Sequence, residues 1–226
     1  MVDQQNRLHE IPATISETIY WYVKKAVLDG EFKPKQRIQE KDIAGLYHVS
    51  TTPVREALRR LAVEKFLFLD ARRGVVVTPV SLEDIKELFQ VVTVLDIFAT
   101  KRALQALRPE SLAELKQMTR ELGESYREKQ ILPYVKTNLE IHFKIWEDCG
   151  NKFLRQTLRD FGEKFAFYSH QFFLLIPSPD VYFEKSYKDH LDLITALEDK
   201  DQVRVERILI SHWGKGFLGE NDVKRG

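Results

Sequence analysis

The sequence contains almost no cysteine and no long apolar run. Its single cysteine, Cys149, cannot form a disulfide within the chain and excludes a cysteine-rich zinc site. No apolar stretch approaches the roughly 18 residues that a membrane-spanning helix needs, and the first residues lack the apolar core of a signal peptide. We therefore expect a cytoplasmic protein that has no membrane as a partner.

The chain of 226 residues also lacks a charge imbalance, because its formal net charge is only +1. The charges are spread unevenly: residues 1–78 carry 13 Lys and Arg against 10 Asp and Glu, whereas the remainder carries 22 against 24. Hydrophobic residues make up 43% of the chain, which is enough for a substantial core. These values fit a slightly basic N-terminal part joined to a neutral globular domain, and alone they do not indicate nucleic acid.

The N-terminal third has the pattern of a winged helix-turn-helix. Apolar residues recur at helical spacing in three segments, and the last two are close enough for a helix-turn-helix. The predicted helices cover residues 14–28, 40–47 and 50–65. Two β-type runs, 66–69 and 75–77, surround a turn with Gly74, which predicts a hairpin. At its tip, Arg72 and Arg73 can reach phosphates or a minor groove, or can form a solvated turn.

The third helix has features of a helix that reads DNA. Val54, Leu58 and Leu61 form one apolar stripe, which leaves Arg55 and Arg59 on other faces. Hydroxyl groups and a proline stand at its start, where free N–H groups suit a phosphate. Such a helix can lie in a DNA groove, although the same pattern also occurs in an ordinary solvated helix. The residues at its start are Ser50, Thr51, Thr52 and Pro53.

The remainder of the chain is predicted to be entirely helical. Thr78 and Pro79 interrupt the pattern and Ser81 can cap a helix, so we place a domain boundary between residues 78 and 79. Beyond it, apolar residues recur at helical spacing in six segments without a convincing strand, which predicts a helical bundle. The expected helices cover residues 82–107, 111–129, 134–149, 153–176, 182–197 and 203–218.

Residues 14–78 resemble the GntR superfamily of bacterial winged-helix repressors. The resemblance is carried above all by Thr52-Pro-Val-Arg-Glu-Ala-Leu58, with support from Leu28-Asp-Gly30 and Ile43-Ala44. It implies that the third helix and the hairpin bind double-stranded DNA. By resemblance, the contacts fall on Lys41, Ser50, Thr51, Pro53, Arg55 and the wing near Gly74, and the neighbouring Thr52, Arg59, Arg72 and Arg73 are added as candidate contacts.

Four positions depart from the pattern of this family. Thr51 stands where members usually have an arginine that reads a base, so the resemblance does not imply a base preference. Lys35, His48 and Lys65 each replace a glycine that is usual there. These changes leave the predicted fold intact and indicate a divergent member.

The helical part resembles the FadR-type effector domain called FCD. The segments that carry this resemblance are His142-Phe143, Cys149-Gly-Asn151, His190-Leu191 and His212. Together, the two resemblances imply a mainly α-helical protein with two domains. Residues 1–78 are expected to form a winged helix-turn-helix DNA-binding domain, and residues 79–226 an all-helical domain for effector binding and dimerisation.

Histidines on three predicted helices form a candidate metal site. His142, His190 and His212 could converge inside the bundle, and Asn138 lies one turn before His142. Neutral imidazoles there could ligate zinc or nickel, or could be satisfied by hydrogen bonds. The resemblance favours a divalent metal, because many FCD domains hold one through an Asp-x-x-x-His pair and two later histidines. Asn138 takes the place of that aspartate, and its amide brings no charge.

The effector pocket implied by the resemblance lacks a usual arginine. Members that bind small carboxylates often have an arginine one turn before an acidic residue, whereas here Val92 precedes Asp96. Loss of the guanidinium removes a bidentate carboxylate partner, so the ligand is apolar, bound through the metal, or absent. Phe165 and Tyr168 belong to an aromatic helix that could line an apolar pocket, or could form plain core or dimer surface.

The function expected from these features is that of a homodimeric transcriptional repressor. A small-molecule effector in the helical domain, with or without assistance from the metal, would change its affinity for operator DNA. A metal-dependent enzyme that uses the three histidines is the alternative, and it would need an open coordination position and a nearby general base. A structural module whose winged helix binds protein is a third alternative.

Overall fold

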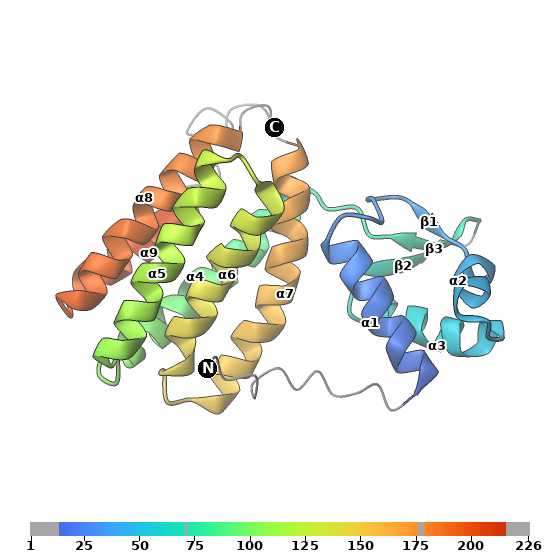
Figure 1. Cartoon of the computed structure of the whole chain (residues 1–226), viewed down its shortest axis with the longest axis horizontal. Helices are drawn as coiled ribbons and strands as arrows, with labels where there is room; N and C mark the ends of the chain where they lie inside the picture. The colour runs from blue at the N-terminus through green and yellow to red at the C-terminus, as the bar shows by residue number, and fades with distance from the viewer. Residues whose placement is uncertain (1–13, 71, 176–178, 216–226) are drawn as a thin grey trace. The chain divides into compact units, whose positions relative to one another are not determined.

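The computed structural model describes residues 14–70, 72–175 and 179–215 (Figure 1). The chain divides into two compact units, Met1–Pro79 and Val80–Gly226, and each is described by itself. Among the described residues, no helix combines the length and the apolar character that a membrane crossing requires.

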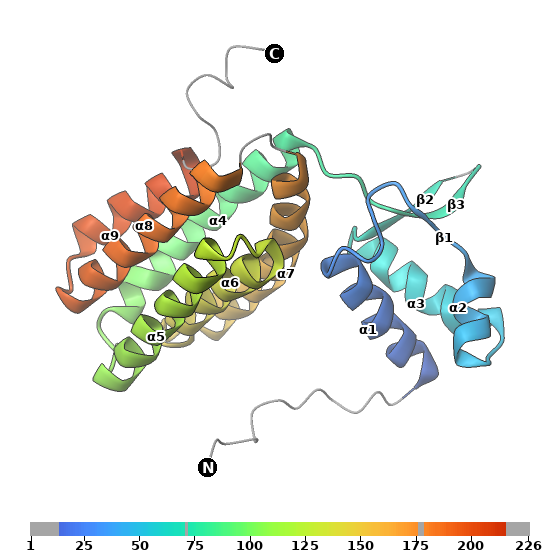
Figure 2. The same cartoon turned by 45° about the horizontal axis from the view of Figure 1, so that its top comes forward.

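The N-terminal unit is a winged helix-turn-helix, as predicted. Its elements are α1 (Ile15–Leu28), β1 (Arg37–Ile38), α2 (Glu40–Tyr47), α3 (Thr51–Val63), β2 (Leu67–Asp70) and β3 (Gly74–Val77). The strands form an antiparallel sheet in the order β1-β3-β2, with Arg37 opposite Val76 and Leu67 opposite Val77. Figure 2 shows this sheet beside the three helices. The hairpin of β2 and β3 is the predicted wing.

The core of this unit lies between α1 and α3. The predicted stripe of Val54, Leu58 and Leu61 is buried, and Ile19 and Val23 of α1 are buried with it. Because this stripe faces the core, the opposite side of α3 is left to solvent. The amphipathic spacing in the sequence therefore decides which side of α3 can meet a partner.

Three residues of this unit hold a backbone conformation that favours glycine. The angle φ is 64° at Lys35, 53° at His48 and 70° at Lys65. These are the three positions at which a glycine is usual in the family that the sequence resembles. A left-handed conformation costs a residue with a side chain roughly 1–2 kcal/mol, so the turns on both sides of α3 are formed at a local cost.

The C-terminal unit is a bundle of helices, as predicted. Its elements are α4 (Leu82–Ala103), α5 (Pro109–Arg127), α6 (Ile131–Glu147), α7 (Lys152–Leu175), α8 (Pro179–Glu198), α9 (Gln202–Ile210) and a π-helix, η2 (Ser211–Lys215). A capping box starts α4, because Ser81 and Asp84 each accept the backbone N–H of the other. Helix α4 packs against α6, α7, α9 and η2, and it passes behind α6 in Figure 1.

The last helix differs from the sequence prediction. One helix is expected over residues 203–218, but α9 ends at Ile210 and the π-helix follows it. Residues 216–218 of this predicted helix lie outside the described residues, and so does residue 176 of the helix predicted over residues 153–176. The π-helix carries His212 and Trp213, which are adjacent and both buried.

Candidate DNA-binding face and metal centre

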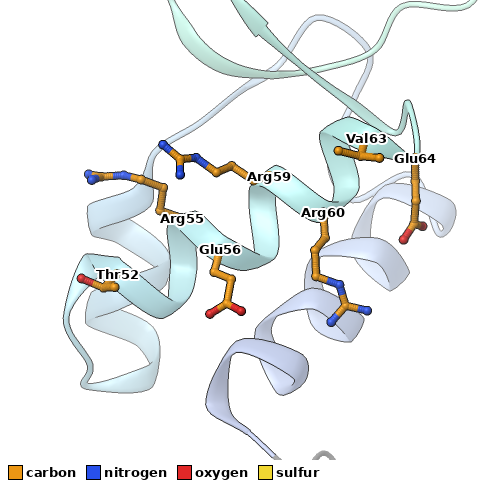
Figure 3. Close-up of a pocket in the computed structure, with 7 residues that line it drawn as sticks. All are labelled: Thr52, Arg55, Glu56, Arg59, Arg60, Val63 and Glu64. Carbon is orange, nitrogen blue, oxygen red and sulfur yellow. The ribbon is translucent and has the colours of Figure 1, made fainter.

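The solvent-facing side of α3 carries hydroxyl and guanidinium groups. Ser50 is the N-cap, and its side chain makes no capping hydrogen bond within the described helix. The first N–H groups of α3 can therefore receive an anion. The exposed residues here are Ser50, Thr51, Thr52, Arg55 and Arg59, and Pro53 beside them is half-buried. Figure 3 shows Arg55 and Arg59 directed to the same side, along a concave surface lined by Thr52, Arg55, Glu56, Arg59, Arg60, Val63 and Glu64.

Arg55 is held by an ion pair with Glu40, the first residue of α2. Its Nε donates to the two carboxylate oxygens at 3.1 and 3.2 Å, and its Nη2 donates to Oε2 at 2.8 Å. A guanidinium has five N–H groups, so pairing along the Nε–Nη2 edge leaves the Nη1–Nη2 edge for another acceptor. Arginine uses that edge on guanine O6 and N7 or on a phosphate. Lys41, next to Glu40, is exposed.

Arg60 differs from the other arginines of α3. Its guanidinium lies 4.2 Å from the centre of the Tyr20 ring of α1, and Figure 3 shows it directed toward α1. The Tyr20 hydroxyl donates to Glu64 at 2.8 Å and accepts from Lys24 at 2.9 Å. Arg60 therefore contributes to the packing of α1 on α3.

The tip of the wing is held in shape by Asp70. Its Oδ1 accepts the backbone N–H groups of Arg72 at 2.8 Å and Arg73 at 2.7 Å. These two bonds lower the pKa of Asp70 below its ordinary value. Gly74 closes the turn with φ of 80°, a conformation that suits glycine. The side chains of Arg72 and Arg73 are exposed at this tip.

Three histidines meet inside the C-terminal unit, as predicted. His142 of α6, His190 of α8 and His212 of η2 are all buried, and one ring nitrogen of each lies within 4.8 Å of those of the other two. The Nε2 atoms of His142 and His212 are 3.3 Å apart. Two nitrogens at about 2.0–2.1 Å from a tetrahedral zinc ion lie roughly 3.3–3.4 Å from each other. This spacing therefore fits two ligands of one metal ion.

The outer nitrogen, Nδ1, of each ring faces an oxygen acceptor. The acceptors are the Ser186 carbonyl for His190 at 2.7 Å, Asp96 Oδ2 for His142 at 3.0 Å and Asp189 Oδ2 for His212 at 3.6 Å. Since these oxygens only accept, the proton belongs on Nδ1 and the lone pair on Nε2. The buried Nε2 of His190 has no hydrogen-bond partner among the described residues. A metal ion bound by the three Nε2 atoms would satisfy it.

The interior position favours the neutral form of His190 and His212. Burial lowers the pKa of His190 well below the ordinary value, and the neighbouring rings of His212 and His142 lower it further. Burial also lowers the pKa of His212, although the hydrogen bond with Asp189 opposes this shift. Neutral imidazole is the form that binds metal, so the residues present fit a zinc or nickel ion.

Asp96 of α4 lies directly against the histidines. Its Oδ1 accepts the Thr100 hydroxyl at 2.8 Å and the Trp146 indole N–H at 2.6 Å, and its Oδ2 accepts the Trp213 indole N–H at 2.8 Å. Burial would raise the pKa of Asp96, but His142 and these hydrogen bonds hold the pKa below its ordinary value. The carboxylate lies at ion-pair distance from Nδ1 of His142, which has no hydrogen-bond partner among the described residues, and it occupies the place of the carboxylate partners of metal-bound histidines.

Asn138 is buried on α6, one turn before His142. Its Oδ1 lies 3.5 Å from the hydroxyl of Ser186, the residue whose carbonyl faces His190. The amide is thus close to a partner of the histidines, and its role as a fourth ligand stays a prediction.

The residues predicted to line an effector pocket lie in and around this core. Val92, Asp96 and Phe165 are buried, and Tyr168 is half-buried. The ring centre of Phe165 lies 4.9 Å from that of Trp213. Their contact with an effector stays a prediction.

Several residues around the histidines were not identified from the sequence. Trp146 follows His142 at i+4, a spacing that places both on one face of α6 and could have identified it. The role of Trp213 depends on the π turn, which leaves no periodic pattern in a sequence. The residues missed are Trp146, Ser186, Asp189 and Trp213.

Known proteins share both units of this chain. Residues 15–77 match the model of bacterial regulatory proteins of the gntR family, and residues 87–215, more than half of the chain, match the FCD domain. The Nta operon transcriptional regulator of Aminobacter aminovorans is 27% identical over 195 residues, which cover 86% of this chain and 89% of the relative. The transcriptional repressor RspR of Escherichia coli K12 is 20% identical, with 88% of this chain and 85% of the relative covered.

Solved structures have the same fold. McbR/YncC of E. coli superimposes with a TM-score of 0.73 at 20% identity, covering 89% of this chain and 94% of that one. A GntR regulator from Rhodococcus sp. RHA1 gives a TM-score of 0.74 at 18% identity, covering 89% and 95%. The chain belongs to the GntR family of bacterial transcriptional regulators and has an FCD domain in its C-terminal unit.

Proposed function

We propose that the protein is a homodimeric repressor that inserts its two α3 helices into successive major grooves of a palindromic operator. Residues 1–78 serve as the DNA-binding domain and residues 79–226 as the effector-binding and dimerisation domain. Arg55 contacts a base through its free guanidinium edge. Phosphates are contacted by the hydroxyl groups at the start of α3, by the side chains of Arg59 and Lys41, and by the arginines of the wing.

We further propose that the FCD domain holds a divalent ion, zinc or nickel, through His142, His190 and His212. Asn138 offers an amide oxygen as a fourth ligand. The single observation that carries this proposal is the set of three buried imidazoles whose Nε2 atoms face one another while each Nδ1 faces an oxygen. When bound, the ion would supply a Lewis-acidic position at which a ligand oxygen can bind.

The effector is proposed to be a small molecule that binds beside the metal, with Val92, Phe165 and Tyr168 as apolar wall. Val92 cannot pair with a carboxylate as an arginine would, so a charged effector would depend on the metal. Repression is the favoured direction because relatives include the repressor RspR and the gluconate operon repressor of Bacillus licheniformis. An enzyme is not favoured, because the matching families are regulators.

Metal content and operator binding test these proposals separately. Protein purified without added metal is measured by elemental analysis beside the triple variant His142→Ala, His190→Ala, His212→Ala. We expect close to one zinc or nickel per chain in the wild type and a trace in the variant. Equal metal content in both proteins would exclude this site.

Operator binding is measured by fluorescence anisotropy on the protein's own promoter region at several salt concentrations. We expect specific binding whose logarithmic affinity falls linearly with the logarithm of the salt concentration. Absence of binding at low salt, with and without metal, would contradict the repressor proposal whatever the metal content is.

A further inference from the structure

The carboxylate of Asp96 joins three elements of the FCD domain. It belongs to α4, it accepts the indole N–H of Trp146 from α6, and it accepts the indole N–H of Trp213 from η2. Its Oδ2 also lies 3.0 Å from Nδ1 of His142. One ionised group thus contacts both elements that flank the His142–His212 pair.

The bonds of Asp96 are fully buried, since its exposed fraction is 0% and those of Trp146 and Trp213 are 1% each. Water cannot replace a bond that breaks at such a site, so a broken bond leaves a charged or polar group without a partner. A displacement of either tryptophan ring therefore has to be followed by α4 or else breaks a buried bond. Buried polar groups of this kind favour discrete alternatives over gradual deformation.

The π-helix connects Trp213 directly to the metal site. His212 and Trp213 are neighbours in η2, and their ring centres are 4.8 Å apart. A metal ion bound by the Nε2 atoms of His142 and His212 would restrain the short segment that also carries the Trp213 indole. That indole N–H donates to the carboxylate of Asp96.

Helix α4 is the first element after the winged helix. Residues 78–81 lead from β3 to Leu82, the first residue of α4. A change in the position of α4 therefore moves the end of residues 78–81, the segment that leads to the DNA-binding unit. No other helix of the bundle has this direct connection in sequence.

We propose that Asp96 is the positioning residue that couples occupancy of the three-histidine site to α4, and through α4 to DNA affinity. This inference rests on the proposed metal site and concerns its regulation. Asp96 then acts through its hydrogen bonds, which join the Trp146 and Trp213 rings to α4. Metal binding sets the position of the Trp213 indole, and the carboxylate that accepts its N–H holds α4 in the matching position.

The chain offers a matched pair of substitutions. Trp213→Phe removes the only bond of Asp96 to η2 that the described residues contain, and it keeps an aromatic ring against Phe165. Thr100→Val also removes one neutral donor from Asp96, but that bond lies within α4. Only Trp213→Phe removes a hydrogen bond between α4 and η2, the element that carries His212.

The experiment measures two quantities for each protein. Zinc affinity is measured by competition with a chromophoric chelator, and operator affinity by anisotropy with chelator-treated and with zinc-loaded protein. For the wild type and Thr100→Val, we expect zinc to change operator affinity by at least about fivefold, the lower end of typical allosteric coupling. For Trp213→Phe, we expect zinc affinity within about threefold of the wild type and an operator response below about twofold.

Each outcome decides between the alternatives. A full response in Trp213→Phe, or loss of the response in both variants, would overturn the role of Asp96 as the connection to η2. A wild type that binds zinc without any change in operator affinity would overturn the coupling but leave the metal site intact. A wild type that binds no zinc would overturn the metal site itself, and the inference with it. Asp96→Asn should lose the operator response as Trp213→Phe does, and it should also bind zinc more weakly because it removes the carboxylate beside His142.

Discussion

Among single residues, Arg55 combines exposure with a fixed orientation. Its pairing with Glu40 restrains the side chain and leaves the Nη1–Nη2 edge free. This matters to the proposed DNA binding because Thr51 stands where the family pattern described above usually has a base-reading arginine. Under that proposal, Arg55 is the residue of α3 that distinguishes a base.

Arg55→Ala is expected to weaken operator binding by roughly 1–3 kcal/mol, which is the cost of losing one bidentate base contact. Anisotropy titrations on operator and on unrelated DNA measure this loss, which should be larger on the operator. Arg60→Ala is the matched control, since Arg60 stacks on Tyr20: it should lower stability more than operator affinity. Equal losses on both DNAs would assign Arg55 to a phosphate instead.

Lys65 allows a test of backbone strain at a single position. Its φ of 70° is unfavourable for a side chain, and glycine would relieve roughly 1–2 kcal/mol of that cost. Glycine also gains entropy in the unfolded chain, which offsets about 0.5–1 kcal/mol. We expect Lys65→Gly to raise the free energy of unfolding by about 0.5–1 kcal/mol.

Urea denaturation monitored by circular dichroism measures this change. Lys65→Ala is the control, because alanine keeps the strained Cβ and removes only the long side chain. A gain of stability in Lys65→Ala equal to that in Lys65→Gly would mean that the charge, and not the backbone conformation, is responsible.

At the scale of elements, α8 and η2 contribute buried histidines whose neutrality depends on pH. The pKa values of His190 and His212 lie below the ordinary value in the folded protein, and near 6.5 in the unfolded chain. The unfolded chain thus binds more protons as the pH falls below about 6.5, so the folded state loses stability there and keeps it above. We expect the metal-free protein to unfold at lower urea concentration at pH 5.5 than at pH 7.5.

Tryptophan fluorescence can follow this loss in the FCD domain alone. The chain has three tryptophans, and Trp21→Phe leaves the reporters Trp146 and Trp213 beside the histidines. His48→Gln is the control, because His48 is exposed in a turn of the other unit and should not alter the pH dependence. Equal urea midpoints at pH 5.5 and 7.5 would show that the buried imidazoles do not resist protonation.

Local patterns predicted most elements, and the exceptions have identifiable causes. The stripe of Val54, Leu58 and Leu61 predicted α3 because residues on one face of a helix recur every three or four positions in the sequence. The break after Ile210 was not predictable in this way, since a π turn changes the hydrogen-bond register without a marker residue.

The three-histidine cluster likewise was predictable only in part. Resemblance to the FCD family pointed to the three histidines, and their convergence is confirmed. The place of the Asp96 carboxylate beside them was not predicted, because its bonds join Asp96 to Trp146 and Trp213, which are 50 and 117 residues away in sequence. Contacts between residues so far apart in sequence depend on the tertiary packing of α4, α6 and η2. The spacing of apolar residues along the chain does not indicate that packing.

At the scale of the whole molecule, the proposed homodimer predicts a rule for the spacing of operator half-sites. Two α3 helices held by one dimer meet successive major grooves, so the half-sites should lie about 10 base pairs apart, centre to centre, or a multiple of this. Five inserted base pairs rotate one half-site to the opposite side of the duplex, where only one α3 can bind. Ten inserted base pairs restore the side but increase the distance.

We expect a five-base-pair insertion to reduce affinity toward that of non-specific DNA, and a ten-base-pair insertion to recover part of the loss. Anisotropy titrations on an operator selected in vitro measure both, with a single half-site as control. Since two linked contacts bind more tightly than either alone, the single half-site should bind as weakly as the five-base-pair insertion. If all spacings bind equally, each winged helix acts independently, and an effector in the FCD domain could not regulate by changing the distance between the two DNA-binding units.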